Sequence, residues 1–210
     1  MGKIEITKKV LGICATNCYT VVDTETKEAL IIDPADRADV LIRDWKNKDV
    51  TPTTVLLTHG HFDHIGALAG VKKEYPDIKV YAAAEEKEVM ESPALNLSSS
   101  FGAAFTAQAD IYLEDGAEIE VLGRKCKCLL VPGHTKGGMC YYFPEESVVF
   151  TGDTLFCYSV GRTDFPTGDA KALENAIREQ LFTLPDDTLV LPGHDAQTMI
   201  GKEKTGNPYF

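Results

Sequence analysis

Alternating hydrophobic and polar positions predict β-strands in the first third of the chain. The strands are expected at residues 3–10, 17–23 and 28–34, where Val, Ile, Thr and Tyr recur between turn-forming residues. Val40, Leu41, Asp44 and Trp45 then repeat at the spacing of a helix, and TTVLLT at 53–58 has the pattern of another strand. The chain therefore alternates strand, helix and strand before it reaches a segment rich in histidine.

The middle of the chain continues this alternation. Residues 64–76 are expected to form a helix that ends at Pro76, followed by a strand at 78–84 and a helix at 84–91. The stretch from Ser92 to Ala109 has weak periodicity and many small residues. We expect it to be a mobile insert or lid.

The second half repeats the order of strands followed by a helix. Strands are expected at 110–115, 117–123, 125–134, 138–144 and 147–153, then a helix at 169–184 and a strand at 188–195. Leu173, Ile177, Leu181 and Leu184 form one apolar stripe of that helix. Two mixed sheets packed back to back, each covered outside by helices, would bury every apolar face, so we expect an α/β sandwich in one domain spanning 1–210.

Composition and charge narrow the class of protein. The chain has 210 residues, of which 44% are hydrophobic and 25% charged, as in ordinary soluble proteins. No segment approaches the ~20 apolar residues of a membrane span and no signal peptide is evident, so a cytoplasmic protein without a membrane partner is expected. The net charge of −11 argues against nucleic acid as a partner. Reduced thiols are expected for the six cysteines.

The histidines share one kind of position. All five follow an apolar run and lie near a glycine, in LLTHGHFDHIG, LLVPGHTKGG and LVLPGHDAQ: His59, His61, His64, His134 and His194. Asp63 lies within the first motif, and Asp153 has the same setting in VVFTGD. Imidazole together with carboxylate suits zinc or iron better than calcium or magnesium. Because a four-coordinate zinc site with an open position needs three protein ligands, this set is large enough for two divalent metal ions.

These motifs resemble those of the metallo-β-lactamase superfamily over residues 17 to 195. THGHFDHIG has the H-x-H-x-D-H pattern of that family, and His134, Asp153 and His194 match its later ligand positions. The resemblance implies the αββα fold. It also implies that His59, His61 and His134 hold the first metal, that Asp63, His64 and His194 hold the second, and that Asp153 bridges them.

The implied chemistry is hydrolysis by a hydroxide that bridges two metals, for which zinc is favoured and iron or manganese are alternatives. Asp63 and Asp153 are the expected catalytic residues, with Asp63 also orienting the nucleophile. The segment GDTLFCYSVGRTDFPTGD at 152–169 resembles the small bacterial glyoxalase II-like branch, whose members hydrolyse S-acylglutathione thioesters. A small-molecule thioester is therefore the expected partner. Arg162 either binds a substrate carboxylate or pairs with Asp164 or Asp169.

Other activities stay open at this point. Persulfide dioxygenases of the same superfamily share the GRTDF run and bind one iron through residues that match His59, His134 and Asp153, so a mononuclear-iron oxidoreductase is the main alternative. A hydrolase of another small ester or lactone is a further one. A domain that keeps its metals without catalysing a reaction is the third, and the intact ligand set argues against it. The sequence predicts no particular oligomeric state.

Overall fold

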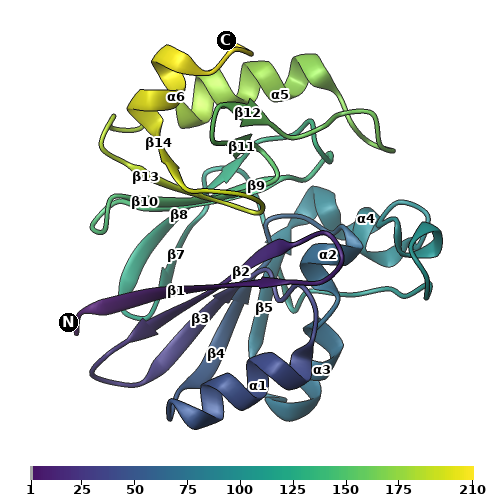
Figure 1. The fold of residues 1–210 in the computed structure, drawn as a ribbon, viewed down its shortest axis with the longest axis vertical. Helices are drawn as coiled ribbons and strands as arrows, with labels where there is room; N and C mark the ends of the chain where they lie inside the picture. The colour runs from purple at the N-terminus through teal and green to yellow at the C-terminus, as the bar shows by residue number, and fades with distance from the viewer. Residues whose placement is uncertain (1) are drawn as a thin grey trace.

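Two six-stranded β-sheets lie face to face at the centre of the structure, a computed structural model that describes residues 2–210 (Figure 1). The first sheet has the strand order β1-β2-β3-β4-β5-β6. β1 and β2 are antiparallel to their neighbours, and β3 to β6 run parallel. The bounds are β1 (Ile4–Leu11), β2 (Thr16–Asp23), β3 (Glu28–Ile32), β4 (Thr51–Leu56), β5 (Lys79–Ala83) and β6 (Ile111–Leu113).

The second sheet has the order β14-β13-β10-β9-β8-β7. β8, β10 and β13 point the same way, because β10 is parallel to β13 and β9 is antiparallel to both β8 and β10. The bounds are β7 (Glu118–Val121), β8 (Arg124–Leu130), β9 (Met139–Phe143), β10 (Val148–Gly152), β13 (Leu189–Pro192) and β14 (Thr198–Met199). A separate two-stranded hairpin joins β11 (Leu155–Phe156) to β12 (Ser159–Val160).

Helices cover the outer face of each sheet. α1 (Ala38–Asn47) and α3 (Leu68–Glu74) lie below the first sheet in Figure 1, and α5 (Ala170–Ala176) and α6 (Ile200–Gly206) lie above the second. In α1 the fully buried Leu41 and Trp45 are four residues apart and so share the inner face. The Trp45 indole N–H donates to Thr20 Oγ1 of β2 at 3.1 Å, which fixes this helix against its sheet.

Three groups of buried side chains fill the spaces between these layers. One lies between the first sheet and α1 and α3, one between the two sheets, and one between the second sheet and α5. Tyr19, Leu56, Cys128, Tyr141 and Phe150 belong to the middle group, so the facing sheets share one apolar core. The expected αββα sandwich, two mixed β-sheets flanked by helices, is confirmed.

Two expected helices are broken. The helix expected at 64–76 forms as α2 (Phe62–Ile65) and α3, because the chain turns at Gly66. A Cβ at that position would lie 2.5 Å from the Ala35 carbonyl oxygen, so the backbones approach too closely for a larger residue. The helix expected at 169–184 is α-helical only to Ala176 and continues as the π-helical η3 (Ile177–Leu181).

The segment 84–109 adds only short helices beside the first sheet. The helix expected at 84–91 forms as η1 (Ala84–Glu86) and α4 (Lys87–Glu91), and η2 (Ser98–Ser100) follows. The fully buried Asn96 donates through Nδ2 to the Met90 and Phe105 carbonyl oxygens at 3.3 and 2.9 Å. One side chain thus ties the expected lid to the end of α4. Within residues 2–210, no helix is long and apolar enough to cross a membrane.

Candidate metal centre

The seven predicted ligands converge at one edge of the sandwich. The loop of His59, His61, Asp63 and His64 follows β4, and the other ligands follow β8, β10 and β13, which run in the same direction. Their ligand atoms form three overlapping groups in which all atoms lie within 4.8 Å of one another. These groups are His59, His61 and His134; His59, His64 and Asp153; and Asp63, His64 and His194.

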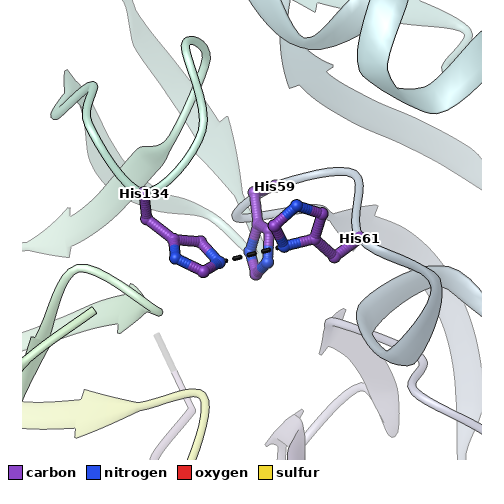
Figure 2. Close-up of side chains that lie close together, drawn as sticks. All are labelled: His59, His61 and His134. Carbon is purple, nitrogen blue, oxygen red and sulfur yellow. Dashed lines mark hydrogen bonds between the residues drawn. The ribbon is translucent and has the colours of Figure 1, made fainter. Parts of the chain in front are cut away.

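The first predicted metal position is formed by three buried imidazoles (Figure 2). Nδ1 of His61 lies 2.9 Å from Nε2 of His134, and the His59 ring packs edge-on against both rings with centroids 4.8 Å away. Burial, followed by the neighbouring His134, lowers the pKa of His61 to about 3. Burial likewise lowers the pKa of His59 well below its usual value. Both rings are thus neutral near pH 7, which is the form that binds a cation.

The second predicted position lies beside the first. Nε2 of His194 is 3.4 Å from Asp63 Oδ2, and Nε2 of His64 is 3.7 Å from the same oxygen. Burial opposes ionisation of Asp63, but the charge on His64 together with hydrogen bonds from His194 and Thr16 outweighs it and lowers the carboxyl pKa to about 2. Burial alone would lower the pKa of His194. Hydrogen bonds to Asp153 and Asp63 outweigh this effect and raise the pKa to about 9. Carboxylate and imidazole thus meet here as strongly interacting charges.

Asp153 lies between the two positions. Its Oδ2 is 3.6 Å from Nε2 of His134 and 3.3 Å from Nε2 of His194, and its Oδ1 is 3.3 Å from Nε2 of His64. Although burial disfavours the charged form, His64 holds the pKa of Asp153 well below its usual range. The carboxylate therefore contacts both groups of imidazoles, as a bridging ligand must.

Several of these buried atoms have no hydrogen-bond partner within residues 2–210. They are Nε2 of His59, His61 and His64, and Oδ1 of Asp153. A buried polar atom without a partner is costly unless a bound water or ion satisfies it. Imidazole nitrogens beside ionised carboxylates are the ligands that zinc and iron prefer, so the donor set fits two divalent cations, whose binding would displace the protons held by His64 and His194. The individual ligand roles stay predictions.

Comparison with known protein families agrees with this geometry. The family model described as the metallo-beta-lactamase superfamily matches residues 11–194. The chain belongs to the metallo-β-lactamase superfamily. Probable metallo-hydrolase YqgX of Bacillus subtilis is 37% identical over 95% of this chain and 94% of its own length. Hydroxyacylglutathione hydrolase GloC of Haemophilus influenzae is 36% identical over 92% of each chain.

Solved structures of the superfamily share the fold over nearly the whole chain. BLEG-1 B3 metallo-beta-lactamase has a TM-score of 0.92 at 38% identity, covering 98% of this chain and 99% of its own. The di-iron-bound form of TTHA1623 has a TM-score of 0.85 at 35% identity, covering 97% and 100%. ETHE1 from Myxococcus xanthus has a TM-score of 0.79 at 32% identity, covering 97% and 83%. As a member of this superfamily the chain is a metallo-hydrolase-type protein with sites for divalent metals.

Asp33 contacts a predicted ligand from behind, and no sequence motif points to it. Its Oδ2 accepts a hydrogen bond from the Thr58 hydroxyl at 2.6 Å and lies 2.8 Å from Nδ1 of His64, while its Oδ1 accepts from the Thr58 backbone N–H. A carboxylate behind a metal-ligating histidine fixes the ring and its tautomer. Its position directly after β3 is the one local signal, and the contact itself depends on the long-range pairing of β3 with β4.

Glu86 was also missed, and it contacts the ligand loops from behind. The carboxylate is 1% exposed. It accepts from the Gly60 backbone N–H at 2.8 Å and from the Thr135 hydroxyl at 2.9 Å. Gly60 lies between His59 and His61, and Thr135 follows His134, so one carboxylate fixes two ligand loops. No local pattern in the sequence indicates this contact.

Gly193 and Gly152 explain why glycine recurs beside the ligands. A Cβ on Gly193 would lie 2.4 Å from Asp153 Oδ1 and 2.7 Å from the His64 ring. Gly152 has φ +49°, and a Cβ there would lie 2.2 Å from the Thr58 hydroxyl oxygen. Any side chain at either position would push the ligand loops apart.

Arg162 lies near the metal centre, but its guanidinium is already paired with Asp164. Its Nε and Nη2 donate to the two carboxylate oxygens of Asp164 at 2.7 and 2.6 Å, and its guanidinium lies 3.9 Å from the Phe165 ring centroid. The Arg162 carbonyl oxygen lies 2.7 Å from Nδ1 of His134, within hydrogen-bond distance. The structure thus has the Asp164 pairing, and the role of Arg162 in binding a substrate carboxylate stays a prediction.

Proposed function

We propose that this protein is a binuclear metal-dependent hydrolase of small thioesters such as S-acylglutathione. The observation that supports it most is the position of Asp153, whose carboxylate contacts imidazoles of both predicted metal positions. The similarity to GloC, a hydroxyacylglutathione hydrolase, supports the thioester class. Zinc is the proposed metal, with iron or manganese as alternatives, and the di-iron form of TTHA1623 keeps iron in consideration.

The proposed reaction adds water to the thioester carbonyl. When bound, the two cations would make a hydroxide available near neutral pH and polarise the carbonyl oxygen. A bond forms between the carbonyl carbon and the water oxygen, and the carbon–sulfur bond breaks. Of the two protons of the water, one ends on the thiol and the other on the carboxylic acid, which ionises in solvent. A thiolate leaves readily, because the pKa of a thiol is ~8.5. The chain therefore needs no strong general acid.

Asp63 has the proposed role of orienting the nucleophile. Its Oδ2 accepts a hydrogen bond from the Thr16 hydroxyl at 2.8 Å, and the side chain lines the cavity beside the imidazoles. Thr16 begins β2, so the first sheet fixes the direction of this carboxylate. Asp63 lies in the first turn of α2, and His61 is the N-cap residue of the same short helix.

A mononuclear-iron oxidoreductase is the second candidate. The GRTDF run that persulfide dioxygenases share lies at the centre, since the Phe165 ring packs edge-on against the His61 ring with centroids 5.7 Å apart. A hydrolase of another small ester or lactone would use the same nucleophile. The likeness to BLEG-1, which is named a metallo-beta-lactamase, is the reason to assay a β-lactam amide as well.

One preparation distinguishes these activities. Metal content is measured after purification without chelators, and the same sample is assayed with S-lactoylglutathione, with glutathione persulfide under an oxygen electrode, and with a lactone and a β-lactam. Two metals per chain with thiol release and no oxygen uptake would support the proposal. One iron with oxygen consumption would instead establish the oxidoreductase. Less than half a metal per chain would contradict both.

A further inference from the structure

A cavity of about 420 Å³ opens beside the metal centre. Besides the ligand side chains, most of its lining is apolar, and four phenylalanines contribute: Phe62, Phe101, Phe156 and Phe165. Phe156 and Phe165 pack edge-on against ligand rings, with centroids 6.1 Å from His194 and 5.7 Å from His61. These two rings therefore line the cavity directly beside the predicted metal positions.

Phe62 and Phe101 form a different part of the wall. Their rings are stacked, with centroids 4.7 Å apart and planes 16° apart. Phe62 lies between His61 and Asp63, so its position is fixed by two predicted ligands. Phe101 comes from the 92–109 segment and is 49% exposed, although a ring of this size is usually buried. The pair thus presents an unpartnered aromatic surface next to the reacting centre.

The same cavity has little positive charge. Within the described residues 2–210, Arg162 is its one lysine or arginine, and the guanidinium is already paired with both oxygens of Asp164. Asp195 adds a carboxylate to the lining. A substrate recognised through carboxylates needs free cations, ideally planar guanidinium groups. This cavity instead has free apolar surface.

We propose that the acyl group of the substrate packs against the Phe62–Phe101 pair, so that the enzyme selects thioesters with aromatic or other apolar acyl groups. The thiol carrier is held only weakly, and its carboxylates are not what the site recognises. The inference rests on the proposed thioester hydrolysis and names its substrate class. It predicts that small polar acyl groups such as lactoyl are poor substrates compared with phenylacetyl.

The test compares three acyl groups on two carriers with zinc-loaded protein. Acetyl, lactoyl and phenylacetyl thioesters of glutathione and of the uncharged N-acetylcysteamine are assayed for kcat/KM. Acyl groups differ in intrinsic reactivity, so kcat/KM for the phenylacetyl thioester is first divided by kcat/KM for the acetyl thioester. This ratio is then compared between the wild type and Phe101→Ala. We expect it to be about ten times higher in the wild type, as for loss of apolar contact in a specificity pocket.

Two variants make the comparison specific. Phe101→Leu keeps an apolar side chain and should retain part of the preference. Tyr209→Ala removes another exposed aromatic ring, 58% exposed and outside this cavity, and should leave the ratio unchanged. Changing the carrier from glutathione to N-acetylcysteamine should alter kcat/KM by no more than about threefold. Metal content and thermal unfolding of each variant confirm that it is folded and loaded.

The possible results separate this inference from the proposed function. If the wild type hydrolyses the thioesters but the ratio is equal in Phe101→Ala, or if glutathione is preferred by far over the uncharged carrier, the acyl-selection proposal is wrong and thioester hydrolysis stands. If the wild type with two metals hydrolyses none of the six compounds, the proposed function itself is wrong.

Discussion

Asp33→Asn should weaken the second metal position selectively. The carboxylate accepts from the Thr58 backbone N–H through Oδ1 at 2.8 Å and lies 2.8 Å from His64 Nδ1 through Oδ2. An asparagine can keep only one of these contacts. If its NH₂ replaces Oδ1, two donors face each other at Thr58. If it replaces Oδ2, it favours the His64 tautomer with a proton on Nε2, which cannot bind a cation.

The size of the effect follows from the hydrogen bond that is lost. A buried hydrogen bond to a charged group contributes roughly 1.5–3 kcal/mol. At 1.36 kcal/mol per factor of ten, this corresponds to about a 10- to 100-fold lower affinity for the cation. Loss of a carboxylate behind a metal-ligating histidine has effects of the same order in other metal sites. The position formed by His59, His61 and His134 should change by less than about threefold, because Asp33 contacts none of its rings directly.

The assay is titration of metal-free protein with Zn²⁺ in competition with a chromophoric chelator. The wild type should show two affinities, of which one falls in the variant. Asp39→Asn is the matched control, since that carboxylate is exposed and pairs with Arg37, far from the ligand loops in sequence. Thermal unfolding is measured in parallel because Asp33 also holds Thr58. Unaltered affinities at both positions, or equal weakening of both in a folded variant, would refute the reasoning.

Substitutions at Asp153, His194 and Glu86 have different expected outcomes. Asp153→Ala should lower the content of both metals, whereas His194→Ala should lower mainly the second, as measured by elemental analysis; equal and negligible losses would contradict the bridging role. Glu86→Ala leaves two buried donors without an acceptor and should lower the free energy of unfolding by about 2–5 kcal/mol, while Glu88→Ala, at an exposed carboxylate, should change it little. Burial raises the pKa of Glu86 from 4.5 to about 7, so the folded protein holds this proton more tightly than the unfolded chain. Its contribution to stability should therefore be present below pH ~4.5 and fall by about 3 kcal/mol as the pH rises through ~7, and the difference between wild type and Glu86→Gln in urea unfolding should show that slope.

The ligand loops could be predicted because each feature is local in sequence. An apolar run followed by glycine and histidine indicates a strand that ends at a loop, and four such loops had to converge if they shared metals. Parallel β8, β10 and β13 produce that convergence. The short elements could not be predicted in this way. β11, β12 and β14 have two residues each, and a pattern of period two cannot be recognised over so few positions.

Asp33 and Glu86, the two carboxylates that contact the ligand loops from behind, show a second reason why the sequence alone does not predict the whole site. Asp33 reaches His64 because β3 pairs in parallel with β4, with Ile32 opposite Leu56. That register is a long-range property, so the separation of 31 positions between Asp33 and His64 conceals the contact. Glu86 is harder still, because it reaches Gly60 and Thr135 from a turn of 3-10 helix on another part of the chain. Patterns identify atoms that could bind metal, whereas tertiary packing decides which buried charges orient them.

The arrangement also separates the metals from the choice of substrate. Phe62 is fixed between two predicted ligands, but its stacking partner Phe101 belongs to the 92–109 segment, which contributes no ligand. The Asn96 side chain joins that segment to Met90 of α4, and the Asn96 backbone carbonyl oxygen accepts from the Phe62 backbone N–H at 2.8 Å, whereas the Phe101 backbone N–H bonds to Ser98 within the segment. Substitutions at Phe101 itself can therefore alter the apolar wall while leaving the ligand loops in place. A superfamily in which one metal centre serves several activities requires this kind of independence, and we expect acyl preference to vary with the residue at position 101 while metal affinity stays constant.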